Sequence, residues 1–198
     1  MARDLSPKWK RCRREKYSLY DNDDWKRRQG LPGEHPVSRR RPSSYAIRFR
    51  EKQKVKRIYG LLERQFRRFF RTAEETKGNT GVKLLQLLEM RLDNVVYRLG
   101  LASTRNAARQ LVNHGHITVN DDKVDIPSYI VEVGDEVRIK KNSRKKEFVK
   151  VLEEESKRRK IPRWLERLPL GGKVKAEPTR NDIDKGINEQ LIIEYYSR

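Results

Sequence analysis

Four arginines between residues 91 and 109 are of a type that could bind a polyanion: Arg91, Arg98, Arg105 and Arg109. The planar guanidinium group offers a fork of N–H donors that can bind one phosphate through two hydrogen bonds and can stack on an exposed base. The alternative for any one of the four is an ion pair with Asp93, Asp121 or Asp125. We expect most of them to contact nucleic acid.

Two short helices must position these arginines. Apolar residues recur at 92, 95, 96 and 99 with helical spacing, and Arg91 and Arg98 fall along the edge of that apolar face. Gly100 ends the helix, and a second helix begins near Thr104 and carries Arg105 and Arg109 on its flank. The pattern predicts two helices that share a core and present arginines beside it.

Further polar residues follow at the end of the second helix: Asn113, His114 and His116. The two histidines could be a metal pair, but no third ligand lies close in the sequence. Contact with nucleic acid is the better interpretation, and we expect no metal site.

From residue 117 the pattern changes to period two. Residues 117 and 119, then 124 and 126, then 137 and 139 are apolar and alternate with polar neighbours across two turns. This predicts a small antiparallel sheet. Two helices followed by such a sheet form an α+β unit.

The chain before this unit is strongly basic and helical in pattern. Apolar residues recur from Val55 to Ala73 at steps of three and four, with a break near Gly60. Between Arg48 and Arg71, only Glu51 and Glu63 oppose ten cations, which we expect to hold RNA phosphates. The ten are Arg48, Arg50, Lys52, Lys54, Lys56, Arg57, Arg64, Arg67, Arg68 and Arg71.

The ends of the chain complete the predicted organisation. Residues 1–44 form an irregular basic arm, whose densest charge is Arg39, Arg40 and Arg41. The C-terminal segment is too apolar for a free tail, and we expect it to dock on the first helical region. The predicted domains are the arm, a mainly helical domain made from 45–90 and 150–198, and an inserted α+β module over 91–149.

The charge of the whole chain favours a nucleic-acid partner. Lys and Arg number 48 and Asp and Glu number 28 among 198 residues, a formal net charge of +20. A surface so basic attracts a polyanion over a long range. A membrane is the rival partner, but no run approaches the roughly 18 apolar residues of a spanning helix, and residues 1–16 lack the apolar core of a signal peptide. We expect a cytoplasmic protein with no membrane contact.

No catalytic chemistry is indicated. The sequence has no P-loop, HExxH or GxSxG motif, and nothing around Asp93 supplies a nucleotide pocket. Cys12 is the only cysteine, so a cysteine-rich zinc site cannot form within the chain. We expect neither an enzyme nor a cofactor.

Residues 87–137, from LLEMRLDNVVYRLG to IVEVGDEV, closely resemble the RNA-binding module of the bacterial small-subunit ribosomal protein S-four family. The segments SYAIRFREKQKVKRIYGLLERQF and INEQLIIEYYSR resemble the same family in the same order. The resemblance therefore covers essentially the whole chain. Many relatives carry four zinc-binding cysteines in the arm, and this sequence departs from them because only Cys12 and His35 could serve as ligands there.

The resemblance implies a structural constituent of the small ribosomal subunit. Such a protein binds ribosomal RNA first, at a junction of several helices in the 5′ domain, and so nucleates assembly of the subunit body. It also implies contact with protein five, with protein three nearby, at the tunnel through which messenger RNA enters. The residues around Arg40 would lie near that tunnel, and the contact with protein five would bear on translational accuracy. No homo-oligomer is expected.

Two other functions remain as alternatives. One is an RNA-modifying enzyme or accessory factor that shares only the RNA-binding module, although 198 residues leave little room for a catalytic domain. The other is a nonspecific nucleic-acid-binding protein, which would bind duplex DNA about as well as ribosomal RNA.

Overall fold

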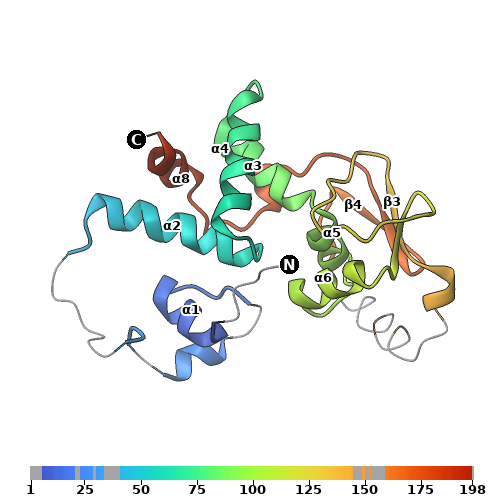
Figure 1. Cartoon of the computed structure of the whole chain (residues 1–198), viewed down its shortest axis with the longest axis horizontal. Coiled ribbons are helices and arrows are strands. Elements are labelled where there is room, and N and C mark those ends of the chain that lie inside the picture. Colours follow the sequence, from blue (N-terminus) through green and yellow to red (C-terminus); the bar gives the residue numbers. More distant parts are fainter. Residues whose placement is uncertain are drawn as a thin grey trace. The chain divides into compact units, whose positions relative to one another are not determined.

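The structure is a computed structural model that describes residues 6–20, 23–28, 30–33, 41–144, 149, 152 and 159–197. The chain forms two compact units, one made from Met1–Gly81 with Lys185–Arg198 and the other from Val82–Asp184. Figure 1 shows the helices of the first unit in blue to green with the C-terminal helix in dark red, and the sheet of the second unit in yellow to orange. Within the described ranges, no helix is long and apolar enough to cross a membrane.

The first unit is helical. Its elements are α1 (Lys8–Glu15), the 3-10 helix η1 (Asp24–Arg27), α2 (Ser44–Ile58), α3 (Glu63–Glu75) and α8 (Glu189–Tyr196). Ser43 caps α2 by accepting a hydrogen bond from the backbone N–H of Ala46. The predicted break near Gly60 is confirmed: its φ of 64° ends α2, and the N–H of Leu61 donates back to the carbonyl of Lys56.

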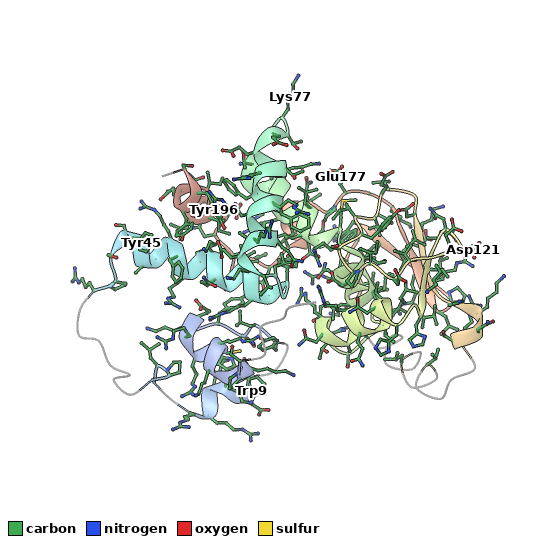
Figure 2. All side chains as sticks on the ribbon, in the orientation of Figure 1. Trp9, Tyr45, Lys77, Asp121, Glu177 and Tyr196 are labelled. Carbon is green, nitrogen blue, oxygen red and sulfur yellow. The ribbon has the colours of Figure 1, made fainter. Side chains whose placement is uncertain are left out.

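The C-terminal helix α8 docks on α2 and α3, as the sequence predicted. The ring of Tyr195 contacts those of Tyr45 and Phe49 on α2, with centroids 5.7 and 6.1 Å away. The ring of Tyr196 lies 4.5 Å from that of Phe70 on α3. Figure 2 shows Tyr196 on α8 and Tyr45 at the start of α2. Aromatic rings thus join the segment after residue 185 to the N-terminal part of the same unit.

Helix α1 is fastened to α2 by one buried carboxylate. The side chain of Glu15 is fully buried and pairs with Arg57 and Arg50 of α2. Burial raises the pKa of Glu15 above its ordinary value, although the two guanidinium groups oppose that shift. Cys12 on the same helix is also buried. This polar anchor and local packing order the described part of the arm.

The second unit combines helices with a five-stranded antiparallel sheet. Helix α4 (Thr80–Glu89) leads into it, and α5 (Leu92–Arg98) and α6 (Arg105–Asn113) pack together. The strands are β1 (Ile117–Val119), β2 (Asp122–Lys123), β3 (Glu136–Ile139), β4 (Leu165–Leu168) and β5 (Gly171–Val174), in the spatial order β2-β1-β3-β5-β4. The short 3-10 helices are η2 (Lys141–Ser143) and η3 (Arg180–Asp182). The α+β class predicted for the chain is confirmed.

One predicted boundary was wrong. We expected residues 150–198 in the helical domain, but residues 165–174 form the hairpin β4-β5, which pairs with β3 and extends the predicted sheet. The reason is packing: Trp164, Leu165 and Val174 belong to the same buried core as α5 and α6. Residues 145–148 and most of 150–158, which we expected to be helical, lie outside the described residues.

Candidate nucleic-acid interface

Asp93 is a buried carboxylate that holds two of the four predicted arginines. It accepts hydrogen bonds from Arg91 through Nε at 3.1 Å and Nη2 at 2.8 Å, and from Arg109 through Nη1 at 3.2 Å. Arg91 lies just before α5 and Arg109 lies on α6, so the carboxylate ties the two helices together. Both arginines therefore form the ion pair with Asp93 that the sequence analysis gave as the alternative to a nucleic-acid contact.

Arg91 does not belong to the candidate interface. Its side chain is only 1% exposed, and both N–H groups on one edge of its guanidinium are bound by Asp93. A phosphate could reach it only if the helices separated. This burial argues against the RNA contact predicted for Arg91, because a long side chain at the edge of an apolar face can turn inward to a buried partner as well as outward. Arg109 is nearly as buried.

A second buried carboxylate, Glu89 at the end of α4, holds Arg98. Arg98 donates through Nε to Oε2 at 2.9 Å and through Nη2 to Oε1 at 2.6 Å, a bidentate pair. Glu89 Oε2 also accepts from the amide Nδ2 of Asn94 at 2.7 Å. Unlike Arg91, the side chain of Arg98 is 23% exposed, so its guanidinium reaches the surface while its position is fixed from below.

Arg105 is fixed by the same network and by a ring. Its Nε donates to Oδ1 of Asn94 at 2.9 Å, and its guanidinium lies 4.4 Å from the centroid of the Tyr97 ring. The guanidinium of Arg159 lies 4.3 Å from the same centroid and donates to the carbonyl of Ala102. Two cations on one buried tyrosine form a compact basic cluster at the ends of α5 and α6.

The polar residues at the end of α6 lie at or near the surface. His114 is exposed, Asn113 and His116 are half-buried, and Nδ1 of His116 lies 2.9 Å from the hydroxyl of Ser143. The two imidazole rings are 6.1 Å apart. Among the residues that the structure describes, no group of three His, Cys, Asp or Glu side chains could hold a metal ion. The arrangement is compatible with the predicted RNA contact.

The six predicted cations of α2 all have carboxylate partners. The pairs are Arg48 with Glu194, Arg50 and Arg57 with Glu15, Lys52 and Lys56 with Glu63, and Lys54 with Glu51. The carboxylates come from α1, α2, α3 and α8, so most of these pairs hold the helical unit together.

Lys52 is buried and cannot contribute to an RNA-binding surface. Its side chain is 3% exposed, and its ammonium lies 4.3 Å from the centroid of the Tyr195 ring. This burial argues against the RNA contact predicted for Lys52. Glu63, which binds this ammonium, illustrates the local field: burial by itself raises its pKa, but hydrogen bonds from Lys52, Tyr196 and Lys56 together hold the pKa below its ordinary value.

Helix α3 presents a different surface. Its four predicted arginines are all exposed and follow the spacing i, i+3, i+4, i+7, which places them in one row along the helix: Arg64, Arg67, Arg68 and Arg71. No carboxylate in the described part of the chain forms an ion pair with any of them. The opposite side of α3 buries Phe66, Phe70 and Ala73. We call these four residues the α3 arginine row.

The basic arm is described only in part. Arg41 is exposed, just before α2, whereas Arg39 and Arg40 lie outside the described residues.

Family models match most of the chain. Residues 3–89 match the ribosomal protein S4/S9 N-terminal domain, and residues 90–137 match the S4 domain. A small ribosomal subunit protein uS4 of Halothermothrix orenii is 50% identical over 208 aligned positions that cover all of both chains. The chain belongs to the uS4 family. The uS4 proteins of Herpetosiphon aurantiacus and Caldicellulosiruptor saccharolyticus are 51% and 49% identical, again over the full length of both chains.

Membership of the uS4 family confirms the resemblance found in the sequence. The chain is a structural constituent of the small ribosomal subunit and not an enzyme. The alternative of an RNA-modifying enzyme that shares only the module is thereby removed, because the match continues through residues 3–89.

Sequence reasoning did not predict the role of four residues that hold the arginines in place or join them: Glu89, Asn94, Tyr97 and Arg159. Asn94 was placed on the correct edge of its helix, but its partners were not predicted. Glu89 precedes the turn into α5, and nothing in helical periodicity pairs it with Arg98 nine residues later. Arg159 carried no motif, and its basic surroundings concealed it.

Proposed function

We propose that this member of the uS4 family is a primary binder of small-subunit ribosomal RNA that nucleates assembly of the subunit body. Its site is a multi-helix junction in the 5′ domain. The observation that carries the proposal is the α3 arginine row, four exposed guanidinium groups on one side of a helix with no carboxylate partner among the described residues. Such a row follows an RNA backbone by neutralising its phosphates.

The basic cluster of the second unit supplies a further contact. Arg98, Arg105 and Arg159 are held in place by hydrogen bonds and by the ring of Tyr97, and they suit a folded RNA whose shape is fixed. We propose the second unit, which contains the predicted module over 91–149 and the strands β4 and β5, as this second binding element. Asn113, His114 and His116 adjoin the basic cluster along the chain.

The proposed contact set is smaller than the predicted one. Arg91 and Lys52 are removed because they are buried, and the remaining α2 cations act first on their carboxylate partners. Arg41, with Arg39 and Arg40, is proposed to contact RNA near the tunnel through which messenger RNA enters. Protein five is the proposed neighbour that links this protein to translational accuracy, with protein three nearby.

The test is binding of the purified protein to the 5′ domain of small-subunit ribosomal RNA, with duplex DNA as competitor. The proposal requires selective binding that survives an excess of DNA and protects nucleotides from several helices around one junction. Equal affinity for the two polymers would mean that net charge alone explains the attraction, and the protein would then bind nucleic acid without specificity.

A further inference from the structure

Glu89 is an anionic residue buried beneath the arginines of a surface that is proposed to bind a polyanion. It is only 1% exposed, so water does not stabilise its charge, and it accepts hydrogen bonds from both Arg98 and Asn94. A carboxylate near phosphate would weaken binding by repulsion if charge were all that mattered. A role for Glu89 in RNA binding must therefore come from something other than its charge.

We infer that Glu89, acting with Asn94, is a positioning residue that sets the guanidinium groups of Arg98 and Arg105 in the geometry that RNA recognises. The inference rests on the proposed RNA-binding function and names how one part of that interface is built. Neither Glu89 nor Asn94 contacts RNA in this account, because both are buried beneath the arginines.

The hydrogen-bond pattern fixes the orientation of each guanidinium. Glu89 binds the edge of Arg98 formed by Nε and Nη2, so the edge formed by Nη1 and Nη2 must face away from the carboxylate. Asn94 accepts a hydrogen bond from Nε of Arg105, and the guanidinium of Arg105 also lies against the Tyr97 ring. Each guanidinium is thus held through its Nε.

One carboxylate controls both arginines because Asn94 is locked in turn. The amide Nδ2 of Asn94 donates to the carbonyl of Glu89 at 2.9 Å and to Oε2 of its side chain at 2.7 Å. With both bonds made, the amide cannot rotate, and its Oδ1 is left to accept from Arg105. Glu89, Asn94, Arg98 and Arg105 thus form one connected unit in which a change at Glu89 reaches both guanidinium groups.

An arginine held this way loses little rotamer freedom when it binds phosphate. A mobile arginine must give up that freedom on binding, which for one long side chain corresponds to about a tenfold loss of affinity. The carboxylate therefore contributes affinity through preorganisation and selectivity through the fixed spacing of two guanidinium groups. Duplex DNA, which lacks the matching shape, would not benefit.

The experiment uses Glu89→Gln in the full chain, which keeps the shape of the side chain and raises the net charge by one. Affinities for 5′-domain RNA and for duplex DNA are measured together. Positioning predicts about tenfold weaker RNA binding with little change for DNA, despite the added positive charge. Charge alone predicts slightly tighter binding to both polymers, and that result would overturn the inference. Glu166→Gln, an exposed site with the same charge change, is the matched control and should not weaken RNA binding.

A double-mutant cycle separates positioning from folding. If Glu89 acts through Arg98, Glu89→Gln has little further effect on RNA affinity once Arg98→Met is present, whereas independent effects that simply add would contradict the inference. Should Glu89→Gln fail to fold, Asn94→Ala provides the same cycle with Arg105→Met and leaves the pair between Glu89 and Arg98 in place.

The wild-type protein in the same titration distinguishes failure of the proposed function from failure of the positioning role of Glu89. Wild type that does not discriminate RNA from DNA would refute the proposed function itself. Selective wild type together with an equally selective Glu89→Gln variant would refute only the positioning role.

Discussion

Replacing the α3 arginine row by glutamine should change the salt dependence of RNA binding more than any other surface change of equal charge. The variant carries Arg64→Gln, Arg67→Gln, Arg68→Gln and Arg71→Gln. All four side chains are exposed, and glutamine has a helix propensity close to that of arginine, so α3 should remain folded. Circular dichroism and thermal unfolding check this before any binding is measured.

The magnitude follows from counterion release. Each phosphate contact contributes about 0.9 to the slope of log K against log salt concentration, so four contacts contribute about 3.6. Between about 50 and 200 mM salt, this part of the slope alone corresponds to roughly a 150-fold loss of affinity. Wild type should therefore lose roughly 150-fold more affinity than the variant over that range.

The matched control removes four surface lysines that already have carboxylate partners: Lys26→Gln, Lys83→Gln, Lys123→Gln and Lys175→Gln. Their partners are Asp23, Glu177, Asp125 and Glu166, at 2.6 to 3.5 Å. The net charge changes equally, but the slope for 5′-domain RNA should change far less. Equal slopes for the two quadruple variants would show that the row makes no phosphate contacts and would refute the reasoning from its exposure and spacing.

Three further outcomes follow from the described contacts. Arg91→Met should lower the free energy of unfolding by about 3 kcal/mol, since it breaks a buried ion pair, yet leave the RNA affinity of the folded protein unchanged. Chemical denaturation measures the loss of stability and RNA titration measures the affinity. A selective loss of affinity would restore Arg91 to the interface. Gly172→Ala should destabilise the second unit by up to about 3 kcal/mol, because a Cβ at this position would overlap Leu99 and lie 2.6 Å from the carbonyl oxygen of Glu166. A thermal midpoint equal to that of wild type would show that β5 can shift to make room for the methyl group. Because the pKa of Glu15 is raised in the folded state, its contribution to stability is fully present below its ordinary pKa and is lost as pH rises through the raised value. Glu15→Gln should therefore gain stability relative to wild type as pH rises from about 4 to 7, which thermal unfolding at several pH values checks. Thermal midpoints that diverge in the opposite sense would mean that pairing with Arg57 outweighs burial.

Helical periodicity was a good guide to which residues face the core. It placed the helices that became α2, α3, α5 and α6, and it marked the break at Gly60, because apolar spacing and a glycine with positive φ are local properties. It also predicted that the C-terminal segment would dock on the first helical region, since a segment so rich in apolar residues must be buried somewhere.

The same reasoning could not decide which way an arginine at the edge of a core would turn. Arg91 and Arg98 occupy equivalent edges, seven residues apart, yet one is buried on Asp93 and the other reaches the surface from Glu89. Arg91 binds Asp93 two residues away, whereas Arg98 binds Glu89 at the end of the preceding helix, and helical periodicity does not tell which of these carboxylates each arginine meets. Strands β4 and β5 were missed because their residues show no two-residue apolar period. Their place in the sheet depends on pairing with β3 and on the close approach of Gly172 to Leu99, which are tertiary contacts.

The docking of α8 on α2 and α3 also has a consequence for the order in which the molecule can mature during translation. The contacts that Tyr45, Phe49 and Phe70 make with Tyr195 and Tyr196 cannot form until these two tyrosines have left the exit tunnel. Every strand of the second unit, in contrast, has been synthesised by residue 174. Units generally fold as their last element emerges. The earlier-made helices α2 and α3 therefore complete their packing only after every strand of the second unit has been synthesised.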